Sequence, residues 1–231
     1  MKSQLTVILY VSVISLFAYS CSPVYIPNST MVFENEAAGE GSVKYRQGIY
    51  STNIQGGYAV SDNFNVGIAV NGLHTTEVTI GTITDLGVQA VEVNAVAGYF
   101  NKFTASNVFE LNVGGGSVFY SRPSEISEYY KLFAQPSISF KNLNENFKAT
   151  ISARMTGVAF NYNDAGIDTA YFRGFGEPMV SLSFGKKVQF LMQGGISIPL
   201  QTEEVFESSP FIFNVGIGYK FGNKRSEFIE P

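Results

Sequence analysis

The chain has 231 residues, a formal net charge of −4, and charged side chains at only 15% of its positions. Tyr and Phe together supply 33 residues, 23 residues are Gly, and Trp is absent. So little charge is unusual for a soluble protein, and the negative balance argues against a nucleic-acid partner. The single Cys excludes an internal disulfide, the single His excludes most His-cluster metal sites, and we expect no cofactor.

Residues 1–20 are typical of a secretory signal peptide. Lys2 provides a short positive start, and Leu5 to Ala18 is an apolar run that is too short to span a bilayer comfortably. The run ends in the sequence FAYSC, which resembles a bacterial lipoprotein cleavage site, so that Cys21 becomes the lipid-attached first mature residue. An ordinary signal peptide with an incidental Cys, or a retained membrane helix, is the alternative.

Residues 21–40, CSPVYIPNSTMVFENEAAGE, are expected to form an extended tether, because Pro23 and Pro27 disfavour a packed helix. The CSPVYIPN opening, the acidic-Gly step after it and the many alternating strands that follow resemble barrel-type lipoproteins of the Bacteroidetes. No acidic run directly follows Cys21, unlike the surface-export signals of those bacteria. The resemblance therefore implies a lipid anchor in the periplasm-facing leaflet.

From residue 41 to residue 222 the sequence predicts an all-β, antiparallel, up-and-down transmembrane barrel of about ten strands, within a range of 8–12. The clearest strand is FIFNVGIGYKF, residues 211–221, in which large apolar residues alternate with small or polar ones. We expect it to close the barrel by pairing with a poorly patterned first strand near residue 41. Pro136 predicts a bulge, and residues 223–231 a polar tail. The expected strands are about 41–49, 51–60, 64–73, 88–100, 109–114, 132–140, 147–156, 178–184, 188–198 and 211–221.

The connections between these strands alternate in length, as they do in outer-membrane barrels with short periplasmic turns and long external loops. Short connections fall near 61–63, 101–106, 142–146 and 185–187, and longer ones near 74–87, 121–129, 162–170 and 200–209. An even strand number places both barrel ends on the turn side, next to Cys21. We therefore expect an outer-membrane location, with the N-terminus and the short turns facing the periplasm.

Aromatic residues bracket the short turns and predict a girdle at one membrane interface. They are Tyr58, Phe64, Tyr99, Phe109, Phe140, Phe147, Phe184, Phe190, Tyr219 and Phe221. Alternation alone does not separate a membrane barrel from a soluble periplasmic one that holds an apolar ligand, as lipocalins do. The lipocalin-like barrel therefore stays as an alternative.

The inward face is expected to be small and mostly uncharged, apart from a cluster of five charges: Glu92, Glu110, Lys148, Arg154 and Lys220. Buried charges cost several kcal/mol unless they are compensated, so we expect them to pair across the lumen. A proton or ion path is one interpretation. A structural plug is favoured, because a barrel this narrow is filled by side chains.

No motif points to catalysis. His74 begins the first long loop, but no Gly-x-Ser-x-Gly elbow accompanies it, and the 161–168 stretch lacks the ligands of a calcium loop. We expect a non-enzymatic outer-membrane lipoprotein with a structural or accessory role, in contact with lipid and docking an envelope partner through its loops or wall. The alternatives are a narrow channel or binder for small apolar molecules, the soluble barrel, and a lipid-remodelling enzyme.

Overall fold

The computed structural model describes residues 25–74, 78–79, 82–83, 88–104, 106–120, 128–142, 144, 146–164, 167–201 and 211–222. The expected signal peptide, Cys21 and the C-terminal tail lie outside these ranges. Among the described residues, no helix has the length and apolarity needed to cross a membrane.

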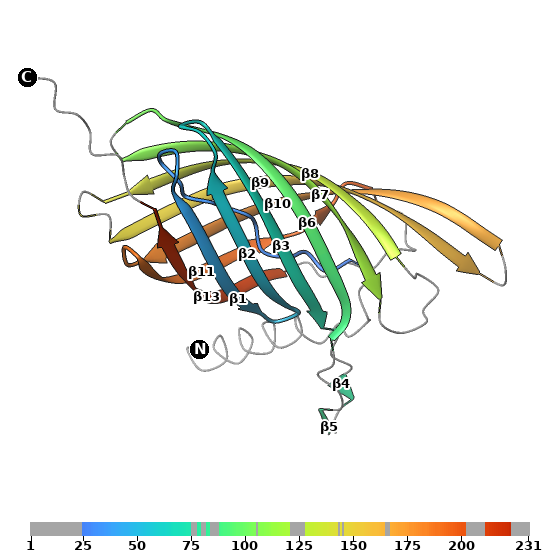
Figure 1. The fold of residues 1–231 in the computed structure, drawn as a ribbon. Helices are drawn as coiled ribbons and strands as arrows, with labels where there is room; N and C mark the ends of the chain where they lie inside the picture. Colours follow the sequence, from blue (N-terminus) through green and yellow to red (C-terminus); the bar gives the residue numbers. More distant parts are fainter. Residues whose placement is uncertain are drawn as a thin grey trace, which may run out of the picture.

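Ten long strands form one closed antiparallel sheet (Figure 1). Each strand pairs with the next along the chain, and the last strand pairs back with the first, so the barrel is of the up-and-down type that the sequence predicts. The short β4 (Val78–Thr79) and β5 (Thr82–Ile83) form a separate pair, while β12 (Ile198–Pro199) prolongs the line of β11 along β10. The wall consists of β1 (Gly41–Gly48), β2 (Ser51–Ala59), β3 (Phe64–His74), β6 (Val88–Lys102), β7 (Asn107–Tyr120), β8 (Glu128–Lys141), β9 (Phe147–Asp164), β10 (Ile167–Phe184), β11 (Val188–Ile196) and β13 (Phe211–Phe221).

The closing seam between β13 and β1 forms as expected, with Gly41 opposite Phe221 and Gly48 opposite Asn214. The outward residues of β1 are Val43 and Tyr45, whereas its inward residues are polar. The alternation is therefore present in β1. It is hard to see in the sequence because the strand is short and has glycine at both ends.

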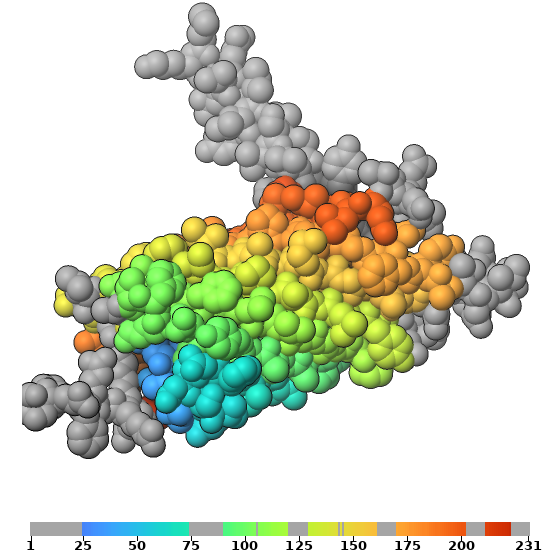
Figure 2. Space-filling model, turned by 90° about the horizontal axis from the view of Figure 1, so that it is seen from above, coloured from blue at the N-terminus to red at the C-terminus, as the bar shows by residue number. Residues whose placement is uncertain are grey.

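The wall is apolar outside and polar inside. On every one of the ten long strands, large apolar side chains are exposed on the outer face, while the buried inner face carries mainly Ser, Thr, Asn, Gln and a few charges. Figure 2 shows one side of this wall, on which β3 to β10 follow one another as cyan, green, yellow and orange bands. Period-two alternation produces this separation, because successive side chains point to opposite faces of a strand.

Pro136 does not cause the expected bulge. It pairs with Leu111 of β7, and the register of β8 against β9 is the same at Ala134 opposite Met155 as at Ser137 opposite Ser152. Proline lacks only its own N–H, so the ladder is interrupted locally without a shift in register. The register shift lies instead at Leu73/His74, where β3 meets β6.

The connection expected near 162–170 is also different. β9 and β10 continue pairing as far as Asp164 opposite Ile167, and this hairpin projects beyond the other strands (Figure 1). The residues there lack a continuous apolar face, so their sequence resembles a loop. Main-chain hydrogen bonds between two adjacent strands need no such face, which explains why the pairing extends further than the pattern predicts.

Candidate functional site: the lumen and its N-terminal segment

Residues 25–35, here called the luminal segment, are buried without exception, although they belong to no regular strand of the wall. The segment appears in Figure 1 as a blue tube that crosses the interior of the barrel before β1 begins. It is extended and not helical, as Pro27 and the polar residues after it predict. It is not an external tether, however, because the wall supplies partners for its side chains and its backbone along its whole length.

At the long-loop end of the barrel, Tyr25 is held between aromatic rings. Its ring stacks on Phe175 with centroids 4.3 Å apart and meets Tyr129 edge-on at 6.3 Å. Its hydroxyl donates a hydrogen bond to Glu177 Oε1 at 2.9 Å. The aromatic contacts and the satisfied hydroxyl together fix this end of the segment.

The position of Tyr25 shows at which end of the barrel the luminal segment begins. The barrel ends at Gly41 and Phe221 do lie on the turn side, but the chain before Gly41 crosses the lumen to the opposite end. Four residues of extended chain reach about 14 Å from Tyr25. By contrast, the wall covers about 28 Å along the barrel axis over the eleven residue steps from Tyr129 to Phe140, at a tilt of about 40°. Tyr25 therefore lies farther from the turn side than four residues of extended chain can reach.

The luminal segment is held at a second place by an ion pair between β9 and β10 that also forms hydrogen bonds with the segment. Arg154 Nε lies 2.5 Å from Glu177 Oε2, and both side chains are buried. The guanidinium also donates to Asn28 Oδ1 at 3.0 Å and to the Asn28 carbonyl at 2.9 Å. Thr156 adds a hydrogen bond of 2.9 Å to the same Glu177 oxygen. The pair therefore has the additional hydrogen bonds that a buried ion pair needs.

A neighbouring network is centred on Glu92. Its Oε1 accepts hydrogen bonds from Lys131 at 2.5 Å, from Asn94 at 2.5 Å and from Asn71 at 3.1 Å. The Asn28 amide of the segment also donates to this oxygen. Several donors from three strands and from the segment thus converge on a single buried carboxylate, which compensates its desolvation.

In the middle of the lumen, wall side chains satisfy the main chain of the segment. The Met31 carbonyl accepts from the amides of Asn112 and Gln135, both at 2.9 Å, and the Val32 carbonyl accepts from Lys44 Nζ at 2.6 Å. A buried backbone group without a partner costs about as much as a lost hydrogen bond. The inward amides are therefore suited to holding an irregular chain inside the barrel.

Glycines of the wall leave room for the large apolar side chains of the segment. Met31 and Phe33 pack with Ala69, Val96 and Phe133 in a buried cluster. A Cβ built on Gly57 overlaps the Phe33 ring, with Cε1 at 2.6 Å and Cγ at 3.0 Å, and a Cβ on Gly67 meets the same ring. These inward glycines create the space that the ring of Phe33 occupies.

Near the turn side, Glu34 is the centre of a third network. Its carboxylate lies 3.4 Å from both Lys44 and Lys220, and it accepts from Gln189 at 3.3 Å. Its backbone N–H donates to Glu110 Oε1 at 3.1 Å. Glu34 adopts a φ of 61°, which is uncommon for a residue with a side chain, and the surrounding contacts hold it there.

The five predicted luminal charges all face the lumen, but they do not pair with one another as expected. Glu92 pairs with Lys131, and Arg154 pairs with Glu177. Lys220 pairs with Glu34, Glu110 accepts from a backbone N–H, and Lys148 Nζ has no hydrogen-bond partner. Lys131 and Glu177 occupy inward positions, which can be identified by extending the period-two alternation along β8 and β10. No strand pattern marks Glu34.

The aromatic residues predicted as a girdle lie beside the short turns and point outward, except that Phe109 is half-buried. Neighbouring rings touch across strands, for example Phe64 and Tyr99 with centroids 5.7 Å apart and Phe147 and Phe184 at 5.2 Å. His74 ends β3, and its side chain lies outside what the structure describes. In the described ranges, no group of three or more His, Cys, Asp or Glu side chains is placed to hold a metal ion.

Comparisons with known proteins find similarity only among solved structures. No family model matches the chain, and no curated protein sequence matches it. A KdgM porin solved with disordered oligogalacturonate is similar over 79% of this chain and 99% of that chain, with 11% identity and a TM-score of 0.37. An outer membrane channel from Pseudomonas putida F1 is similar over 84% and 100%, with 13% identity and a TM-score of 0.44. The N-terminal β-barrel domain of Pseudomonas aeruginosa OprF is similar over 79% and 96%, with 10% identity and a TM-score of 0.30.

Proposed function

We propose that this protein is an outer-membrane barrel closed by its own N-terminal segment, with a structural or accessory role in the envelope. The observation that carries the proposal is the complete burial of residues 25–35 inside the barrel. The segment is held by charged and amide side chains at both ends and in the middle of the lumen. A permeation path through the resting barrel would require these contacts to break.

The apolar outer face supports the membrane location. Exposed side chains such as Leu132, Ile151 and Ile217 cover the wall at mid-strand, where a soluble barrel would present charge to water. A lipocalin-like barrel has the opposite arrangement, with an apolar cavity and a polar exterior. The polar, filled lumen also disfavours a binder for small apolar molecules.

Planar-bilayer recordings test the plug. We expect the intact protein to show no stable conductance steps, and a variant lacking residues 25–35 to show them. Because that deletion removes many contacts, a second variant is also tested. Met31→Ala combined with Phe33→Ala keeps the segment but removes its apolar contacts with the wall, and we expect this variant to show brief openings. Slower gel migration after heating identifies the folded barrel in each sample. Stable, large steps from the intact protein would refute the plug and favour the narrow channel.

The accessory role rests on the same geometry, since a closed barrel offers its wall and its loops for contact but no path through its centre. We propose that an envelope protein docks there. Purification in mild detergent, followed by identification of stoichiometric companions, tests this. A barrel that purifies alone from its own envelope at several detergent strengths would contradict the accessory role and leave the structural one.

A further inference from the structure

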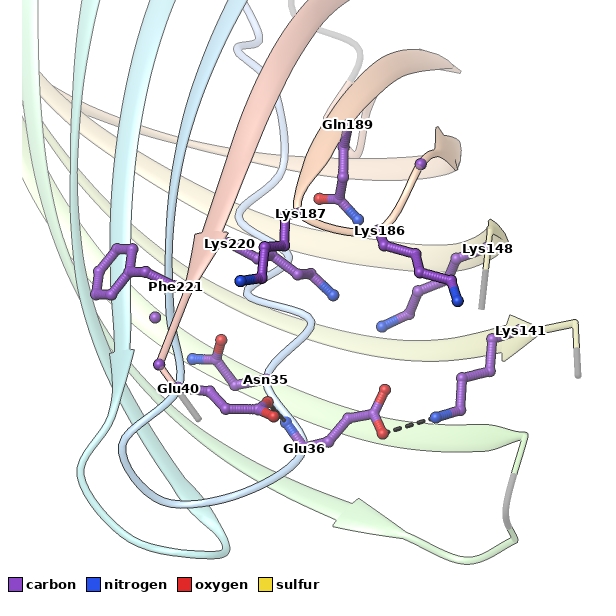
Figure 3. Close-up of a pocket in the computed structure, with 13 residues that line it drawn as sticks. Asn35, Glu36, Glu40, Lys141, Lys148, Lys186, Lys187, Gln189, Lys220 and Phe221 are labelled. Carbon is purple, nitrogen blue, oxygen red and sulfur yellow. Dashed lines mark hydrogen bonds and ion pairs between the residues drawn. The ribbon is translucent and has the colours of Figure 1, made fainter. Parts of the chain in front are cut away.

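The turn-side mouth of the barrel contains a pocket of about 380 Å³ that no part of the proposed function uses. We propose that it binds a phosphate group. Five lysines line the pocket, namely Lys141, Lys148, Lys186, Lys187 and Lys220, and they come from β8, β9, the β10–β11 turn and β13 (Figure 3). Basic residues from four separate parts of the chain thus meet at one opening.

The carboxylates of the pocket do not balance these lysines. Only Glu36 and Glu40 line it, so five positive charges face two negative ones, and because Lys220 also pairs with Glu34 behind the lining at 3.4 Å, a surplus of two remains. Glu36 is already engaged by Lys141 at 2.7 Å and by Lys102 at 3.6 Å. Glu40 accepts the Glu36 backbone N–H at 2.7 Å. The surplus is therefore not neutralised within the lining.

Lys148 is the lysine whose surroundings most directly favour an anion. Its side chain is only 6% exposed, and its Nζ has no hydrogen-bond partner. Lys148 and Lys220 direct their ammonium groups into the same opening from different strands (Figure 3). A buried ammonium group without compensation is strongly destabilising. Within the protein, the competing explanation is the attraction of Lys148 by Glu34 and Glu110, neither of which accepts a hydrogen bond from its Nζ.

The chemistry of the pocket favours phosphate. A lysine ammonium is a compact point charge with three donors, which suits the several oxygens of a phosphate group. The volume also leaves room for the small organic part of a phosphate ester. The mouth opens beside Phe221, an outward aromatic at the turn-side rim, so the phosphate belongs either to a lipid headgroup of that leaflet or to a soluble ester.

Titration of the full-length folded protein in a zwitterionic detergent tests the site, with glycerol 3-phosphate as the soluble probe and calorimetry as the readout at low ionic strength. A parallel arm reconstitutes the protein in nanodiscs of phosphatidylcholine with or without phosphatidylglycerol and counts retained lipids by native mass spectrometry. We expect Lys148→Gln to weaken binding at least tenfold. Lys186→Gln with Lys187→Gln should weaken it severalfold, because exposed charges are screened more strongly.

Arg173→Gln is the matched control, since it removes one positive charge from a half-buried position on β10 that does not line the pocket, opposite Val158 of β9. It should leave binding unchanged. If glycerol 3-phosphate binds, the phosphate group comes from a soluble ester. If only phosphatidylglycerol is selectively retained, it comes from a lipid headgroup of the membrane leaflet. The proposal is overturned if neither probe binds at millimolar concentration, or if Lys148→Gln folds normally and binds as the wild type does. None of these measurements depends on conductance. The phosphate site can therefore be refuted while the plug proposal stands, and the plug can be refuted while the phosphate site stands.

Discussion

Substitution of Gly57 by alanine tests whether the luminal segment occupies the barrel. The added Cβ would overlap the Phe33 ring, with Cε1 at 2.6 Å and Cγ at 3.0 Å, and a ring on a buried side chain has little freedom to withdraw. Overpacking of this kind destabilises by about 1–3 kcal/mol. Gly57→Ala is therefore expected to lower the free energy of unfolding by that amount, measured by urea titration in detergent and read from the gel migration of unheated samples.

The adjacent glycine provides a matched control. A Cβ on Gly56 meets nothing within 4 Å, so Gly56→Ala should leave the free energy of unfolding unchanged or slightly raised. Phe33→Ala by itself should destabilise by about 3–5 kcal/mol, because it empties a buried site. Added to Phe33→Ala, Gly57→Ala should cause little further loss. Equal effects of the two glycine substitutions, or an undiminished effect of Gly57→Ala without the Phe33 ring, would refute the packing of the segment against β2.

Three further predictions concern the lumen, the outer wall and the N-terminus. Arg154→Met and Glu177→Gln should each destabilise by about 3–5 kcal/mol in the same unfolding assay, while the double variant loses clearly less than their sum; additive losses would contradict the buried pair. Ile68→Lys, at mid-strand on the outer face, should cost about 2–4 kcal/mol in lipid, whereas Val60→Lys beside a short turn should cost at most about 1 kcal/mol; equal effects would argue against a membrane around the wall. Palmitate labelling should disappear in Cys21→Ala, and a tag inserted after that residue should be accessible on intact cells; access only after permeabilisation would place the segment outside the lumen.

Much of the wall was predictable because a strand pattern is local. The alternation of Phe211 to Phe221 determines which side chains point outward, and the same rule places Glu92, Arg154 and the other luminal charges on the inner face. Tertiary pairing overrode the local signals at two places. Pro136 remained in register, and the polar stretch after Phe160 continued as paired strands.

The charge partners were predictable only in part. Lys131 and Glu177 stand at inward positions that the period identifies, but which inward charge meets which depends on strand register and on the curvature of the barrel. Glu34 pairs with Lys44 and Lys220 from a segment without any periodic pattern. Its role follows only from the path that the chain takes before β1.

The sequence by itself determined an antiparallel barrel of about ten strands with an apolar outer face, because alternation and turn residues act over short distances. Only the tertiary structure decided what fills the barrel. Residues 25–35 belong to a stretch, 21–40, whose two prolines and polar side chains predicted an extended tether. They are buried because inward amides, paired charges and the space beside Gly57 and Gly67 match their backbone and side chains, and those partners come from strands that are distant in the sequence.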